Sequence, residues 1–192
     1  MSQSNYNTFS TMPYIPYKIV MALIENDNLF KLLYYPTKDA LSQPNLTFEQ
    51  KVNMIWNGED RTDDYTIFLT NIQPNLETIS RPVLKIYRYD TLPKTYTTAV
   101  ISYEFDILFG TKIPLVDFNG VPCNRGDLIE MELMKSLNGQ DVAGVGYLQY
   151  NHQLSTLDRS RVGIGNNSTF TGYYFIMSTI YTDSGRIDGC AQ

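Results

Sequence analysis

The stretch TTAVISYEFDILF, residues 97–109, alternates between two kinds of residue with a period of two. From position 99 onward its odd positions are apolar or aromatic: Ala99, Ile101, Tyr103, Phe105, Ile107 and Phe109. Its even positions carry Ser102, Glu104 and Asp106 between Val100 and Leu108. Such alternation is typical of a β-strand whose two faces have different surroundings. It predicts a sheet with one face on a core and one face mostly in water, where Glu104 and Asp106 point outward.

The segments on either side of this strand predict more strands and three helical regions. Further strands are expected over 65–72, 83–89, 142–150 and 172–182. One helical region spans 17–35 with a break at Asn26-Asp27-Asn28, one of which caps the second part. A second helix starts at a capping box of Thr47 and Gln50 and ends at 57–58, with Phe48, Val52 and Ile55 on one face. A third spans 127–137 and ends at Gly139.

Between these elements, loops are expected around Pro114 and Pro122 and over the polar stretch 151–169. The order of elements is helix, helix, three strands, helix, two strands. This order predicts an α+β fold: a mainly antiparallel sheet with a helix packed across one face, plus N-terminal helices and an extended N-terminal arm.

Composition divides the chain into three parts. Residues 1–12 are mostly Ser, Asn, Thr and Gln with isolated aromatics, and Pro13 and Pro16 follow them. Residues 1–16 therefore predict an extended arm that orders against a partner. Residues 17–182 are expected to form a single α+β domain with a helical insert over 38–64. Residues 183–192 are expected to be a C-terminal tail.

The charge balance argues against a protein that coats nucleic acid. The 192 residues include 15 Lys and Arg against 20 Asp and Glu, a net charge of −5, and no basic stripe is present. The 15 Tyr and 9 Phe fit either strand propensity or protein interfaces, and both readings stay open. No secretory signal and no apolar run of roughly 20 residues occurs, so we expect a soluble protein without a membrane partner.

The residues that commonly carry chemistry are too few to predict an enzyme. His152 is the single histidine, and the two cysteines, Cys123 and Cys190, lie far apart in the sequence. They cannot make a zinc site or a disulfide framework, and they favour assembly under reducing conditions. We therefore expect no catalytic residues, no metal site and no cofactor.

Three short motifs are better explained by local structure than by chemistry. The acidic run 59–64 lacks the ligand alternation of a calcium loop and is expected to be a solvated turn. Gly163-Ile164-Gly165 does not open a helix, as a phosphate-binding fingerprint must. In Arg125-Gly126-Asp127, an adhesion tripeptide elsewhere, Asp127 is expected to be an N-cap or first-turn acid of the third helix.

Four segments stand in a distinctive order along the chain. They are the amphipathic segment ending in Leu32-Leu33-Tyr34-Tyr35-Pro36, the strand 97–109, the helix end Leu137-Asn138-Gly139, and the run 142–148 followed by Gly172-Tyr173-Tyr174. Over residues 17–182 this order resembles the neck and tail-terminator-like proteins of tailed bacteriophages, the head–tail connector proteins. The insert over 38–64 is longer than a minimal terminator-like domain requires.

The resemblance implies a virion structural protein that forms a homo-oligomeric ring, six- or twelve-fold, in the head–tail neck. Such a ring joins the portal or adaptor to the tail proteins, and DNA passes through it only as cargo. It implies assembly in the host bacterial cytoplasm and residence in the virion. An acidic wall of Glu104 and Asp106 would suit a passage for DNA, and residues 2–16 and 151–169 are candidates for ring contacts. The alternatives are another tail or baseplate adaptor protein, or a non-viral α+β protein-binding module.

Overall fold

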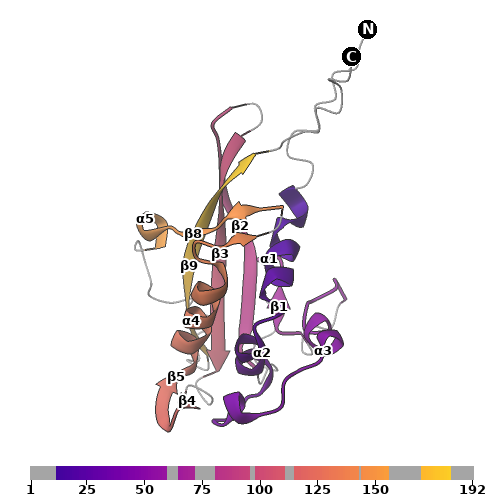
Figure 1. The fold of residues 1–192 in the computed structure, drawn as a ribbon, viewed down its shortest axis with the longest axis vertical. Helices are drawn as coiled ribbons and strands as arrows, with labels where there is room; N and C mark the ends of the chain where they lie inside the picture. Colours follow the sequence, from indigo (N-terminus) through magenta and orange to yellow (C-terminus); the bar gives the residue numbers. More distant parts are fainter. Residues whose placement is uncertain are drawn as a thin grey trace.

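A five-stranded sheet forms the centre of the protein, with the strand order β1-β2-β3-β9-β8 (Figure 1). The computed structural model describes residues 12–59, 65–71, 81–95, 98–110, 115–142, 144–155 and 170–182. Three long strands fill the middle: β2 (Val83–Pro93), β3 (Thr98–Gly110) and β9 (Phe170–Thr182). They pair antiparallel, and β3 pairs with β9 from Thr98↔Thr182 to Gly110↔Phe170.

Short strands complete the two edges of the sheet. At one edge, β1 (Ile67–Phe68) runs parallel to β2, and at the other β8 (Gln149–Tyr150) runs antiparallel to β9. Two small hairpins lie outside the sheet: β4 (Leu115–Phe118) with β5 (Val121–Asn124), and β6 (Asp141–Val142) with β7 (Gly146–Tyr147). The predicted α+β fold with a mainly antiparallel sheet is confirmed.

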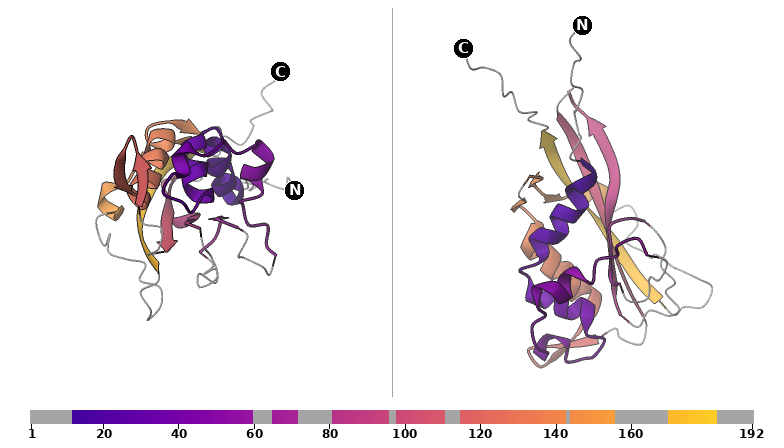
Figure 2. Two further views of the ribbon diagram at one scale, coloured as in Figure 1. Left: turned by 90° about the horizontal axis from the view of Figure 1, so that it is seen from below. Right: turned by 90° about the vertical axis from the view of Figure 1, so that its right-hand side faces the viewer.

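Helices cover one face of the sheet and leave the other without helices in the described part of the chain (Figure 2). The covering layer consists of α1 (Ile15–Leu23), α2 (Asp27–Tyr34) and α4 (Arg125–Leu137). Shorter elements are η1 (Met12–Tyr14), η2 (Ala40–Ser42), α3 (Phe48–Val52) and α5 (His152–Ser155). We call the two sides of the sheet the helix-covered face and the open face.

The main hydrophobic core lies between the sheet and this helix layer. The odd positions of β3 point into it, and Ile101, Phe105 and Ile107 are fully buried there. The ring of Phe105 stacks on that of Phe175 with 4.9 Å between their centroids. Leu29, Leu32, Leu33, Ile129 and Leu133 complete the same cluster from the helices. The predicted periodicity of the core-facing side is therefore confirmed.

A fully buried arginine joins two helices of the covering layer. Arg125, the first residue of α4, donates to the carbonyl oxygens of Leu32, Tyr35 and Thr37 at 2.7, 2.8 and 2.6 Å. These carbonyls lie at and just beyond the C-terminal end of α2, where helix carbonyls lack intrahelical partners. Burial lowers the pKa of Arg125 to about 10, so the guanidinium stays charged near neutral pH.

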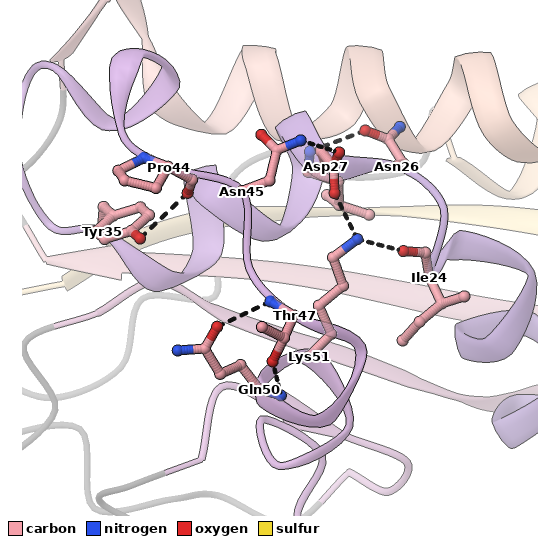
Figure 3. A network of polar contacts seen from close by, with 10 residues as sticks. Ile24, Asn26, Asp27, Tyr35, Pro44, Asn45, Thr47, Gln50 and Lys51 are labelled. Carbon is pink, nitrogen blue, oxygen red and sulfur yellow. Dashed lines mark hydrogen bonds and ion pairs between the residues drawn. The ribbon is translucent and has the colours of Figure 1, made fainter.

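Polar contacts attach α3 to the junction between α1 and α2 (Figure 3). The Lys51 ammonium donates to the Ile24 carbonyl and to Asp27, each at 2.6 Å. The predicted capping box is present, with Thr47 Oγ1 accepting from the Gln50 amide and the Gln50 side chain accepting from the Thr47 amide. The predicted cap between the two N-terminal helices is also present: the Asn26 side chain accepts from the Leu29 amide.

Several predicted boundaries were wrong. Residues 12–16, assigned to the extended arm, form η1 and the start of α1, where Pro16 occupies a first-turn position that suits proline. The helix opened by Thr47 ends at Val52, not at 57–58. Its Phe48 is exposed, and Ile55 instead forms a parallel β-bridge with Ile67.

Elements after β3 also differ from the prediction. The loop expected around Pro114 and Pro122 contains the hairpin β4–β5, which turns at Asn119 and Gly120 with φ of 56° and 81°. The single strand predicted over 142–150 is divided into β6, β7 and β8, because Gly144 and Gly146 adopt φ of 71° and 94°. The third helix starts at Arg125 with Asn124 as N-cap, and Asp127 is a first-turn acid.

Candidate interaction surface

The middle of the open face contains a buried polar cluster, made of Lys85 and Tyr87 on β2 and Glu104 and Asp106 on β3. The register places Lys85 opposite Asp106 and Tyr87 opposite Glu104. Lys85 and Asp106 are only 3% and 4% exposed. The Tyr87 hydroxyl donates to Asp106 Oδ2 at 3.2 Å, and Lys85 Nζ lies 3.8 Å from the same oxygen.

This geometry corrects the prediction that Glu104 and Asp106 point into water. Asp106 is buried and Glu104 is half-buried, because neighbouring side chains of β2 cover the carboxylates. Ser102 and Leu108 on the same face of β3 are buried as well, and Leu108 packs with Phe68 and Val83. An acidic wall formed by Asp106 is therefore not available to a DNA passage.

Burial also changes the protonation of this cluster. It raises the pKa of Asp106 to about 7, and the hydrogen-bonded Glu104 side chain raises it in the same direction, whereas Lys85 and Tyr87 oppose the change. Burial lowers the pKa of Lys85 and raises that of Tyr87. Asp106 therefore titrates near neutral pH. Among the described residues, neither Lys85 nor Asp106 lines either of the two clefts described below.

At one end of the open face, three apolar side chains form a row across the long strands. Leu92 of β2 pairs with Val100 of β3, which pairs with Ile180 of β9. Leu92 is 52% exposed, Ile180 is 68% exposed and Val100 is half-buried. Apolar side chains that lie together on a solvated sheet face are typical of interaction surfaces.

A cleft of about 560 Å³ adjoins this row at the β8 edge of the sheet. Its described lining residues are Val100, Gly146, Tyr147, Gln149, Tyr150, Asn151, His152, Gln153, Ser178, Thr179 and Ile180. None of them is Asp, Glu, Lys or Arg. The polar part of its wall is fixed by hydrogen bonds, since Ser178 Oγ lies 2.9 Å from Asn151 Nδ2 and 2.9 Å from Ser102 Oγ. The cleft therefore combines apolar and neutral polar groups.

A second cleft, of about 490 Å³, lies on the helix layer and is acidic. Glu25, Asp27 and Glu132 are among its lining residues. Glu132 is buried and accepts from Asn26 at 3.1 Å and from Lys135 at 2.8 Å. In the part of the chain that the structure describes, no group of three or more His, Cys, Asp and Glu residues could hold a metal ion. These contacts are accounted for by the packing of α4 on α2.

The residues singled out for chemistry are dispersed over the fold. His152 begins α5 and lines the uncharged cleft, while Cys123 is a half-buried free thiol on β5. The Arg125-Gly126-Asp127 tripeptide is inaccessible to a receptor because Arg125 is fully buried. The glycine pair 163–165, Cys190 and residues 60–64 lie outside the described residues. No described helix is long and apolar enough to span a membrane.

Sequence reasoning missed the apolar row and the partners of Asp106. The signal for the row was present, because Val100 interrupts the polar positions of the alternating strand and Ile180 occupies the equivalent face of the last strand. The signal for the cluster was weaker. Lys85 and Tyr87 are recognisable as partners of Asp106 and Glu104 only once the register between β2 and β3 is known.

A comparison with family models gives the class of protein to which this chain belongs. It is a phage-encoded protein. The chain belongs to the YomW family, a Bacillus phage SPBc2-like gene family, whose model matches residues 26–179. No curated protein and no solved structure is significantly similar to it. The family match includes α2, α4 and nearly all of the sheet.

Proposed function

We propose that this protein is a virion structural subunit that assembles into a homo-oligomeric ring in the head–tail neck of a tailed phage. The ring joins the portal or adaptor to the tail proteins and lets DNA pass. Assembly takes place in the host bacterial cytoplasm, and the protein has no enzymatic activity. The observation that carries this proposal is the apolar row of Leu92, Val100 and Ile180, whose two end residues are exposed, beside an uncharged cleft.

Charge supports self-association through this particular surface. Each chain has a net charge of −5, so two copies repel each other on average. Association is most favourable where neither surface has charge to desolvate, because burying an unpaired charge is costly. The apolar row and the cleft beside it meet this condition. The net negative charge also suits the proposed passage for DNA, because a negatively charged chain does not bind DNA phosphates.

The lack of an evident active site among the described residues supports a structural role in the same way. Among the described residues, the buried cluster around Asp106 brings an acid, a base and a hydroxyl together, but neither Lys85 nor Asp106 lines a described cleft. Catalysis by general acid and base needs such groups within hydrogen-bond reach of a substrate. We therefore assign the cluster to the interior of the sheet face.

The proposal is tested by the mass of the purified full chain, measured by light scattering at several protein concentrations. We expect a ring of six or twelve copies, or a folded monomer that adds to purified neck particles. A monomer or dimer whose mass does not change with concentration, and which does not bind such particles, would contradict the proposal. Binding to purified tail tubes or baseplates instead of neck particles would assign the protein to another part of the tail.

Removal of the N-terminal arm sharpens the same experiment. The deletion should span residues 2–11, because Met12 is buried and its sulfur lies 2.9 Å from Arg88 Nη1. We expect an unchanged circular dichroism spectrum and a loss of the assembled species. Deletion of residues 183–192 is the matched control and should leave assembly intact. Loss of folded protein in the 2–11 deletion would contradict a separate role for the arm.

A further inference from the structure

The uncharged cleft and the apolar row form one continuous receiving surface, because Val100 and Ile180 belong to both. We call it the β9-edge cleft and define it by Val100, Tyr147, Gln149, Ser178 and Ile180. Tyr147 and Ile180 are exposed by 62% and 68%. The surface offers apolar contact from these side chains and neutral hydrogen-bonding groups from Gln149 and Ser178. An occupant that matches it is uncharged, carries aromatic or apolar side chains, and is rich in amides and hydroxyls.

We propose that the N-terminal segment of a neighbouring copy, residues 1–11, occupies the β9-edge cleft; this inference rests on the self-association proposed above. The segment reads MSQSNYNTFST and contains no Asp, Glu, Lys or Arg. Its Tyr6 and Phe9 supply the aromatic side chains, and its Ser, Thr, Asn and Gln supply the neutral polar groups. The C-terminal segment 183–192, DSGRIDGCAQ, matches the cleft less well because three of its ten side chains are charged.

The topology of the sheet favours a neighbouring copy over the same copy. The segment joins the described chain at Met12, which contacts Arg88 on β2, near the β1 edge. Arg88 pairs with Tyr103, so this junction lies on the helix-covered side, and Met12 belongs to the main core. The β9-edge cleft lies at the opposite edge, beside β8. In Figure 1, α1 lies toward the β2 side of the sheet and β8 lies toward the β9 side, while the β6–β7 hairpin reaches α1, where Lys18 donates to the Gly144 carbonyl.

A donor at one edge and an acceptor at the other make a head-to-tail contact. Such a contact uses two different surfaces on each copy, and it forms a ring when the rotation between copies closes. Eleven residues reach at most about 40 Å when extended, which exceeds the roughly 15 Å across three strand spacings. The segment is therefore long enough to leave its own sheet and enter the cleft of the next copy. Because that length also permits wrapping around its own sheet, the test must separate the two paths.

Disulfide crosslinking distinguishes them directly. In a background with Cys123→Ser and Cys190→Ser, one chain carries Ser10→Cys and a second chain carries Tyr147→Cys. After mixing and mild oxidation, we expect a covalent dimer from the two different chains. A chain with both cysteines should give a ladder of covalent oligomers. The proposal is overturned if the doubly substituted chain closes only on itself, or if Ser10→Cys joins Val121→Cys equally well. Val121 is 56% exposed on β5, away from the cleft.

A charge placed in the cleft provides a second, independent measurement. Ile180→Glu is expected to raise the concentration at which half of the chains are assembled by about tenfold or more. Val121→Glu is the matched control and should leave it unchanged, since both residues are exposed in the single chain. If the unmodified chain assembles but neither the crosslink nor the effect of Ile180→Glu is found, this inference fails alone. If the unmodified chain does not assemble at all, the proposed function fails as well.

Discussion

The helix-covered face and the open face are built from the same three strands, yet they do different things. Phe105 on the helix-covered face is fully buried and stacks on Phe175, as expected of a residue that holds a fold together. On the open face, the same strands bury a polar cluster around Asp106 and expose Leu92 and Ile180. The comparison teaches that alternation decides which residues share a face, while their surroundings depend on what packs against that face.

The two faces also treat buried charge differently. On the helix side, Arg125 has three carbonyl acceptors within 2.8 Å, so its charge is well satisfied. On the open side, Lys85 lies 3.8 Å from Asp106, too far for a hydrogen bond, and burial raises the pKa of Asp106 to about 7. Charge on the helix side thus stabilises the packing of α4 on α2, whereas Asp106 makes the open face sensitive to pH.

The largest effect is expected from a cavity on the helix-covered face. Phe105→Ala removes a fully buried ring together with its stacking contact to Phe175. It should lower the free energy of unfolding by about 3–5 kcal/mol. Urea denaturation followed by circular dichroism measures this change. A loss below about 1 kcal/mol would mean that this face does not dominate stability.

A smaller effect is expected from Asp106, and it depends on pH. The pKa of Asp106 is higher in the folded state than in the unfolded state. Between about pH 4 and pH 7, Asp106 is therefore protonated in the folded protein and ionised in the unfolded chain. The free energy of unfolding should therefore fall as the pH rises from 5 to 8, by about 2–3 kcal/mol from this group. Asp106→Asn should flatten that dependence in urea titrations at several pH values. If the free energy of unfolding depended on pH equally in both proteins, a group other than Asp106 would cause the dependence.

The smallest effect on stability is expected from the exposed row. Ile180→Ser should change the free energy of unfolding of the single chain by less than about 0.5 kcal/mol, because the side chain is exposed. The same substitution should weaken assembly. Urea denaturation over a dilution series measures the free energy of unfolding of the dissociated chains. If Ile180→Ser lowered it as much as Phe105→Ala does, the two faces would not differ in their contribution to stability.

Local sequence signals predicted much of this fold because they are decided by neighbouring residues. The alternation over 97–109, the capping box of Thr47 and Gln50, and the helix end at Gly139, where φ is 72°, are signals of this kind. The hairpin β4–β5 had such a signal too, because Asn-Gly is the preferred pair for a two-residue turn. Pro122 in the second strand obscured it, although an edge strand tolerates proline.

Other features depend on parts of the chain that are distant in sequence. Asp106 is buried because the register brings Lys85 and Tyr87 beside it, and nothing near Asp106 in the sequence specifies that register. Arg125 is buried because α2 ends where its three carbonyls can accept from the guanidinium. The exposed row likewise requires three strands to be aligned. Sequence patterns therefore identified the strands and helices, whereas the candidate surface needed their arrangement in space.

Hydrogen exchange of the full chain at low and high protein concentration tests most directly whether the open face at the β9 edge is where copies meet. Peptides that cover 145–153 and 176–182 should exchange more slowly at high concentration, because assembly protects amides that open in the single chain. Peptides from the helix layer, such as those covering α2, should be unchanged. Protection confined to the helix layer, or no concentration dependence at all, would contradict assembly through this face.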